Sequence, residues 1–195
     1  TMKIWMCALT YDQQTIAVDA FPSNIGYVVS YLLHYSKYTY EVRLFKYPAK
    51  LIEAIESSEL PDIIGFSHFM WNANLNHEFS KKLKCLKPEM VVVYGGLNYP
   101  SVGPQQEKWL REHLHCDFHV YKEGEAGFLS LVETLVDTNL AILQAKQCEI
   151  PGVHYLKPHG DFYGPPPAPR VPDLASFPSP YLSGLLDEFF DGKLC

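Results

Sequence analysis

Two apolar runs in the middle of the chain end in residues that would let a ligand approach the backbone closely. Ser67 follows the run at residues 63–66, and Gly95 and Gly96 follow the run at residues 91–94. Side chains this small leave the main chain accessible where a strand ends. The polar and aromatic residues that come next are typical of a site for a large flat or amphipathic molecule. They are His68, Trp71, Asn72, Asn98 and Tyr99. The alternative is that Gly95 and Gly96 only form a tight turn.

Several familiar catalytic and ligand-binding patterns are absent from the sequence. It has no GxGxxG or GxxxxGK[ST] loop and no GxSxG turn. His68 and His77 are expected on different elements, and His113 and His115 cannot share a helix face. This spacing argues against a metal site built from these histidines. The five cysteines are scattered without a CxxC pair, which argues against a zinc ribbon or a disulfide framework. We therefore predict no catalytic residue and no metal ligand in this chain.

Strand-like and helix-like patterns alternate from residue 3 to about residue 137. Residues 63–66 and 91–94 are apolar on both faces, as expected of central parallel strands covered by helices. Ile25, Val29 and Leu32 show the spacing of one helix face. Five strands joined by helical crossovers predict an α/β fold, a doubly wound flavodoxin-like (Rossmann-like) parallel five-stranded sheet of order 2-1-3-4-5.

In such a sheet the ligand lies beyond the carboxyl ends of the strands, where the strand order reverses. Four segments should meet there, and each follows a predicted strand. They are residues 10–14, 67–72, 95–99 and 123–125.

The composition changes after residue 150. Residues 152–156 and 162–163 flank a turn and predict a small β-hairpin. The Pro-rich stretch that follows predicts an extended arm or linker, and residues 181–190 have the apolar spacing of a short docked helix. We therefore expect an α/β domain over residues 1–138 and a hairpin, a Pro-rich linker and a short helix over residues 139–195, leading into a further domain.

The charge balance excludes some classes of partner. The chain has 195 residues and a formal net charge of −6, which argues against a dedicated nucleic-acid or anionic-membrane binder. No apolar run approaches the roughly 18 residues that a membrane-spanning helix needs. We expect a cytoplasmic protein.

Six segments, taken together in order and spacing, resemble the cobalamin-binding domains that precede radical S-adenosylmethionine (SAM) barrels. The first, PSNIGY at residues 22–27, is similar to the opening of the first helix in that family, and DFHVYKEGE at 117–125 is similar to its DFVVRGEGE segment. The other four lie at residues 62–67, 91–96, 150–153 and 166–170. The resemblance covers about residues 3–192.

The resemblance implies a module that presents cobalamin to a radical SAM barrel carrying a [4Fe–4S] cluster and SAM. The CxxxCxxC motif for that cluster is absent from the chain, and Cys195 alone cannot be assigned to it. The parent protein would be a methyltransferase or a related radical SAM enzyme, whereas this piece would not catalyse a complete reaction. The stretch at residues 19–24 has no histidine, so no histidine of this loop would ligate cobalt.

The resemblance also implies the residues that would hold cobalamin. Ser67, Gly95 and Gly96 would make room for its nucleotide tail, and replacing both glycines with valine is expected to abolish binding and keep the fold. The remaining residues would contact the corrin rim or lie beside it: Thr10, His68, Leu97, Asn98, Glu123 and Gly124.

Two other functions stay open. The domain could bind no cofactor and serve as a structural or substrate-gating platform, with Phe69, Trp71 and Tyr99 forming an interface. It could also bind a flavin or another nucleotide. Against the second alternative, the loop after the first strand lacks a Gly- and Ser-rich phosphate cradle.

Overall fold

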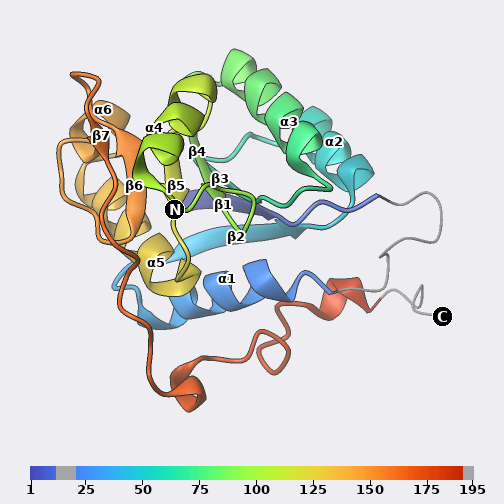
Figure 1. The fold of residues 1–195 in the computed structure, drawn as a ribbon. Helices are drawn as coiled ribbons and strands as arrows, with labels where there is room; N and C mark the ends of the chain where they lie inside the picture. Colours follow the sequence, from blue (N-terminus) through green and yellow to red (C-terminus); the bar gives the residue numbers. More distant parts are fainter. Residues whose placement is uncertain (12–20, 191–195) are drawn as a thin grey trace.

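The computed structural model describes residues 1–11 and 21–190, which form one twisted sheet covered by helices on both faces (Figure 1). The five parallel strands lie in the order β2-β1-β3-β4-β5, which confirms the predicted order. Their bounds are β1 Met2–Cys7, β2 Tyr40–Phe45, β3 Ile63–Ser67, β4 Val91–Gly95 and β5 Phe118–Val120.

The predicted hairpin is present, and it belongs to the same sheet. Strands β6 (Val153–Leu156) and β7 (Phe162–Tyr163) pair antiparallel with each other, and β6 pairs antiparallel with β5. The expected five strands are therefore seven. Val153 and Tyr155 of β6 are fully buried, so the hairpin covers the edge of β5 and adds apolar residues to the core.

Helices cover the two faces of the sheet unequally. On one face lie α1 (Ser23–Tyr35) and α5 (Gly124–Asp137), which pack against each other (Figure 1). On the other lie α2 (Pro48–Ser57), α3 (Ala73–Leu86) and α4 (Gly103–Glu112). The short helix α6 (Ile142–Ala145) follows α5 and was not predicted.

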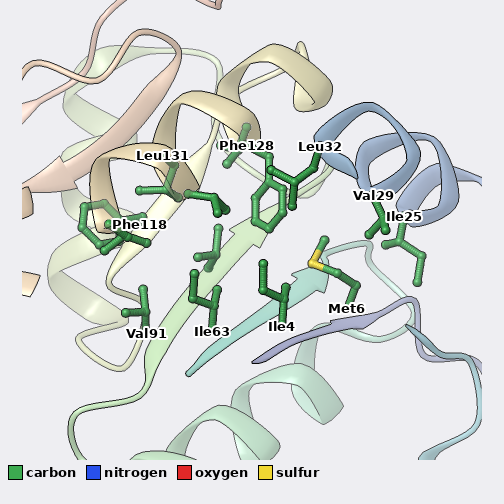
Figure 2. Packing of buried hydrophobic residues seen from close by; sticks show 14 of the residues in the cluster. Ile4, Met6, Ile25, Val29, Leu32, Ile63, Val91, Phe118, Phe128 and Leu131 are labelled. Carbon is green, nitrogen blue, oxygen red and sulfur yellow. The ribbon is translucent and has the colours of Figure 1, made fainter. Parts of the chain in front are cut away.

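Alternation along the strands divides the core into two layers. Ile4 and Met6 of β1 face α1 and α5, whereas Trp5 and Cys7 face the other helices. Figure 2 shows the first layer, in which Val29 of α1 and residues of α5 point at the sheet. Successive side chains on a strand point to opposite faces, so one apolar strand supplies both layers.

The C-terminal segment runs along α1 but is not the expected α-helix. Residues 165–171 form neither helix nor strand, and the turns that follow contain two 3₁₀ helices, η1 (Leu174–Ser176) and η2 (Asp187–Phe189). Leu186 is fully buried, and its methyl groups lie 3.2–3.3 Å from the position a Cβ would take on Gly26 of α1. Gly184 has a φ of +77°, which interrupts a right-handed helix at this point.

The expected division of the chain at residue 138 stays a prediction. Ile150, Val153 and Tyr155 share a hydrophobic cluster with residues of the parallel strands. None of the helices within residues 1–11 and 21–190 is long and apolar enough to cross a bilayer.

Candidate functional site

A cavity of about 240 Å³ lies at the carboxyl ends of the parallel strands, between α1 and α5. Its walls come from β1, β3, β4 and β5, from the loops that follow them, and from the first turns of both helices. Most of the lining is apolar, including Met6, Val93, Val120 and Phe128. The position is the one where doubly wound sheets bind their ligands.

Three glycines, at positions 65, 95 and 96, line this cavity, and an added side chain would have a different effect at each. A Cβ on Gly65 would lie 2.4 Å from the sulfur of Met6, so any side chain there would displace Met6. A Cβ on Gly95 would meet its nearest atom, the Val120 carbonyl oxygen, at 3.7 Å, which is ordinary contact. Gly95 therefore leaves open space that a larger residue could fill.

Gly96 differs from Gly95 because its backbone depends on the absence of a side chain. Its φ is +116°, and a Cβ would lie 2.6 Å from the backbone oxygen of His68. L-amino acids rarely adopt this conformation, and a backbone neighbour cannot move aside cheaply. This geometry argues against the expectation that valine at both Gly95 and Gly96 would keep the fold, whereas a Cβ at Gly95 alone meets only ordinary contacts.

A hydrogen bond joins the polar wall of the cavity to α1. Asn24 donates from Nδ2 to Ser67 Oγ at 2.5 Å, and its Oδ1 accepts from the Ile25 backbone at 2.9 Å. Both Asn24 and Ser67 line the cavity. The end of β3 and the start of α1 are thus connected at the ligand-facing surface.

The remaining wall carries charge where β5 passes into α5. Lys122 and Glu125 line the cavity, and Lys122 has a left-handed backbone with a φ of 62°. Such a conformation costs a non-glycine residue about 1–2 kcal/mol. The neighbouring Glu123 forms an ion pair with Arg170, whose guanidinium nitrogen lies 3.1 Å from the Glu123 carboxylate.

Apolar side chains are exposed beside the strand ends. Phe69 and Trp71 stack with ring centroids 4.5 Å apart, and Met70 and Leu97 are each 83% exposed. Phe69 also lines the cavity. A flat amphipathic ligand entering the cavity would therefore find apolar surface around the strand ends.

A second, larger cavity of about 500 Å³ shares Tyr27 and Glu125 with the first. The Pro-rich segment and η1 form its outer wall, and Arg170 and Leu174 are among its lining residues. The two spaces are thus neighbours at the start of α5.

The opposite layer of the structure contains a cluster of histidines and aromatic rings. His68 is 1% exposed, and its Nδ1 and Nε2 lie 3.4 Å and 3.2 Å from the amide nitrogens of Asn76 and Asn98. Burial, together with the neighbouring His113 and His115, lowers the pKa of His68 to about 4. His68 is therefore neutral at physiological pH.

A chain of hydrogen bonds connects two further histidines to Tyr94 and Ser80. Ser80 Oγ donates to the Asn76 carbonyl, so it accepts from Tyr94 Oη at 2.8 Å. The Tyr94 oxygen then accepts from His77 Nδ1 at 3.1 Å, and the same N–H points at His115 Nε2, 2.9 Å away. Burial is the main cause that lowers the pKa of His77 to about 3 and that of His115 to about 4.

The histidines belong to a closely packed aromatic layer. Within the part of the chain that the structure describes, no group of three or more His, Cys, Asp or Glu residues could hold a metal ion. His119 of β5 is fully buried and stacks on Tyr99, with centroids 3.6 Å apart. The rings fill the space between β4, β5 and α4.

Comparison with known proteins identifies relatives of this chain. No protein-family model matches it. The cobalamin-dependent radical SAM methyltransferase TokK of Streptomyces tokunonensis is 30% identical over 127 residues, which are 65% of this chain and 17% of TokK. The 2-(S-pantetheinyl)-carbapenam-3-carboxylate methyltransferase of Streptantibioticus cattleyicolor is 30% identical over 149 residues, 73% of this chain and 20% of that protein. The chain is related to the cobalamin-dependent radical SAM methyltransferases.

Solved structures show the same fold. The cobalamin-dependent SAM radical enzyme OxsB matches with a TM-score of 0.67 in its aqua-cobalamin form and 0.66 in the form with aqua-cobalamin and SAM. Each match has 18% identity and covers 96% of this chain and 25% of OxsB. The chain thus spans a fifth or less of the curated methyltransferases and a quarter of OxsB.

The structure brings together four of the nine residues that the resemblance to cobalamin-dependent radical SAM proteins implied. Ser67, Gly95, Gly96 and Gly124 line the cavity between α1 and α5. Glu123 lines the second cavity. The assignment of all nine to cobalamin stays a prediction.

The other four predicted residues lie outside both cavities. The Thr10 backbone donates to the Lys46 carbonyl at 3.0 Å, and Leu97 is exposed at the strand ends. The side chains of His68 and Asn98 contact each other in the opposite layer. The loop at residues 19–24, where no histidine ligand is expected, lies partly outside the described residues.

Sequence reasoning missed the residues that the helices contribute. Asn24, Tyr27 and Val28 of α1 and Phe128 of α5 line the cavity, as does Lys122 before α5. The strand ends alone guided the prediction, although α1 and α5 were both expected from their apolar spacing. The available signal was the polar residue Asn24 at the start of an otherwise apolar helix.

Proposed function

We propose that this chain is the cobalamin-binding module of a radical SAM enzyme. The observation that carries the proposal is the cavity between α1 and α5, which lies next to exposed apolar side chains at the carboxyl ends of the strands. The similarity of the chain to a cobalamin-dependent methyltransferase and the fold that it shares with OxsB support the same function. Cobalamin combines a nucleotide tail with a large, flat corrin. The cavity suits the tail, and the exposed apolar side chains beside it suit the corrin.

The lining of the cavity suits the nucleotide tail by its chemistry. Apolar walls formed by Met6, Val93 and Phe128 suit a heteroaromatic base, and Ser67 supplies a hydroxyl group beside them. Gly95 and Gly96 keep side chains out of the space. We assign Ser67, Gly95, Gly96 and Gly124 to the walls around the tail.

The exposed surface beside the cavity is our candidate for the corrin. Leu97 and the stacked pair Phe69 and Trp71 would cover its apolar face. Thr10 and Glu123 would lie at its rim. His68 and Asn98 hold each other beneath this surface, so we assign them the role of positioning the two loops.

Bound cobalamin would supply a cobalt ion able to carry a methyl group, and this chain would bind and orient it. The barrel with its [4Fe–4S] cluster and SAM would belong to the rest of the parent protein, which we propose to be a methyltransferase or a related enzyme. No histidine from residues 19–24 would ligate the cobalt, because that stretch contains none.

Replacing Gly95 with valine tests the location of the tail. The wild-type chain is expected to bind hydroxocobalamin in a titration followed by gel filtration and visible spectra. Gly95→Val is expected to weaken binding at least roughly tenfold, because the valine methyl groups would occupy the cavity while the backbone keeps its conformation. Gly103→Val is the matched control, since a Cβ there has no atom within 4 Å.

The same titration separates the alternatives. Unchanged affinity of a folded Gly95→Val variant would place the tail elsewhere. Flavin absorbance in the purified protein would favour a flavin binder. If the folded chain binds neither compound, a structural or substrate-gating platform becomes the better explanation.

A further inference from the structure

Lys122 is the only positively charged residue among the described residues that line the cavity. Its side chain is exposed, and its Nζ lies 5.1 Å from the centroid of the Tyr121 ring. No ion pair involves Lys122 within the part of the chain that the structure places. The ammonium group is therefore available to a ligand at the entrance of the cavity.

The backbone at this position is unfavourable for lysine. The φ of Lys122 is 62°, in the left-handed region where glycine is the ordinary choice. Lysine holds this strained position directly between β5 and α5. Strained residues of this kind concentrate at ligand sites. Lys122 follows this pattern, because it lines the cavity.

The other charged groups nearby leave Lys122 as the candidate for an anion. Arg170 pairs with Glu123 and lines the neighbouring cavity instead. Glu125 lines both cavities and would repel an anion placed close to it. The first turn of α5 adds backbone N–H groups without a side-chain cap, which favours negative charge at this end of the helix.

We propose that Lys122 binds the phosphodiester group of a nucleotide-bearing corrinoid. This inference rests on the proposed function and specifies which corrinoids the module selects. A complete corrinoid carries one phosphodiester between the corrin and the nucleotide base, whereas a cobinamide has lost both the phosphodiester and the base. With the base in the cavity, the phosphodiester would lie at its entrance, where Lys122 is.

Three variants of Lys122 separate its charge from its backbone. Lys122→Gln removes the charge, Lys122→Arg keeps it, and Lys122→Gly removes the charge together with the backbone strain. The dissociation constants for hydroxocobalamin and for diaquacobinamide are measured at low and high salt. Lys82→Gln is the matched control, because it removes an exposed cation of α3 that lines neither cavity.

We expect Lys122→Gln and Lys122→Gly to weaken hydroxocobalamin binding roughly fivefold at low salt, with Lys122→Arg close to the wild type. The wild-type affinity should fall as salt is added, and that salt dependence should shrink in Lys122→Gln. Any affinity for diaquacobinamide should change less than about twofold in either variant, because the ligand has no phosphodiester for a charge-assisted contact.

Equal hydroxocobalamin affinity and equal salt dependence in the wild type and Lys122→Gln would overturn the assignment of Lys122 and leave the proposed function intact. An equal loss for both corrinoids would also overturn it, because the effect would not come from the phosphodiester. If the folded wild-type chain binds neither corrinoid, the proposed function itself fails, and this inference fails with it.

Discussion

Lowering the pH from 7 to 5 is expected to destabilise the folded chain by at least about 2 kcal/mol, through the buried histidines. Neutral rings are packed between the sheet and α3 and α4, whereas in the unfolded chain the same rings would titrate near their ordinary pKa of 6.5. The unfolded state therefore binds more protons as the pH falls through 6.5. Stability is lost from there down to the folded-state values of about 3 to 4.

His68 alone accounts for about 2 kcal/mol of this loss, because its folded-state pKa is about 4 and its ring is 1% exposed. His77 and His115 add smaller amounts, since both rings are partly solvated. Their hydrogen-bond chain also requires a lone pair on His115 Nε2, which protonation removes. Fully buried His119, whose pKa is also lowered by burial, acts in the same direction.

Urea unfolding at pH 5, 6 and 7 measures the effect directly. The free energy of unfolding of His68→Gln should depend less on pH than that of the wild type, even though the variant is less stable at pH 7. His159→Gln is the control, because His159 is exposed on the β6–β7 turn. Identical slopes for the wild type and His68→Gln would contradict a neutral, buried His68.

Replacing Gly96 with alanine is expected to destabilise the chain by about 3 kcal/mol, which is large for the addition of a single methyl group. The Cβ would lie 2.6 Å from the His68 backbone oxygen and 2.9 Å from its nitrogen, on a backbone with a φ of +116°. Moving either atom would disturb the hydrogen bond from the His68 N–H to the Gly95 carbonyl. Both loops at the cavity depend on that contact.

Gly95→Ala is the matched comparison, because the two glycines are adjacent and only one has a positive φ. The free energy of unfolding of Gly95→Ala should lie within about 1 kcal/mol of the wild-type value, because the added Cβ would meet nothing closer than 3.7 Å. Both variants can be compared by chemical denaturation at pH 7. Equal stabilities of Gly95→Ala and Gly96→Ala would show that the Gly96 backbone is free to relax.

The parallel part of the sheet was predictable because its central strands are apolar on both faces. Residues such as Ile63 and Ile64 cannot both be buried unless helices cover each side, and this condition fixes the architecture. The pairing of β6 with β5 was not predictable in the same way. A hairpin pattern specifies its own two strands and says nothing about which outer edge they join.

The C-terminal segment shows where apolar spacing misleads. Leu182 and Leu186 are one helical turn apart, yet Leu182 is 92% exposed and Leu186 is fully buried. Gly184 lies between them with a positive φ, and Pro178 and Pro180 precede them. The glycine and prolines were visible in the sequence and outweigh the periodicity of the leucines.

The sequence predicted that the candidate site lies at the strand ends. It was a poorer guide to which layer each side chain enters and to which helix residues line the cavity. Ser67 and His68 are neighbours in sequence, and the alternation of strand side chains sends them to opposite layers. This alternation was visible in the sequence and could have separated the two residues. The residues from α1 and α5 could not be assigned without knowing how the two helices turn toward each other over the sheet.

The walls of the cavity come from residues far apart in the chain, from Met6 in β1 to Phe128 in α5. During synthesis from the amino terminus, the β1–β3 portion leaves the ribosome well before α5 does. Because α5 supplies one complete side of the cavity and packs on α1, no nascent chain shorter than about residue 128 can enclose a ligand there. The cavity can therefore be loaded only after nearly the whole α/β layer has folded.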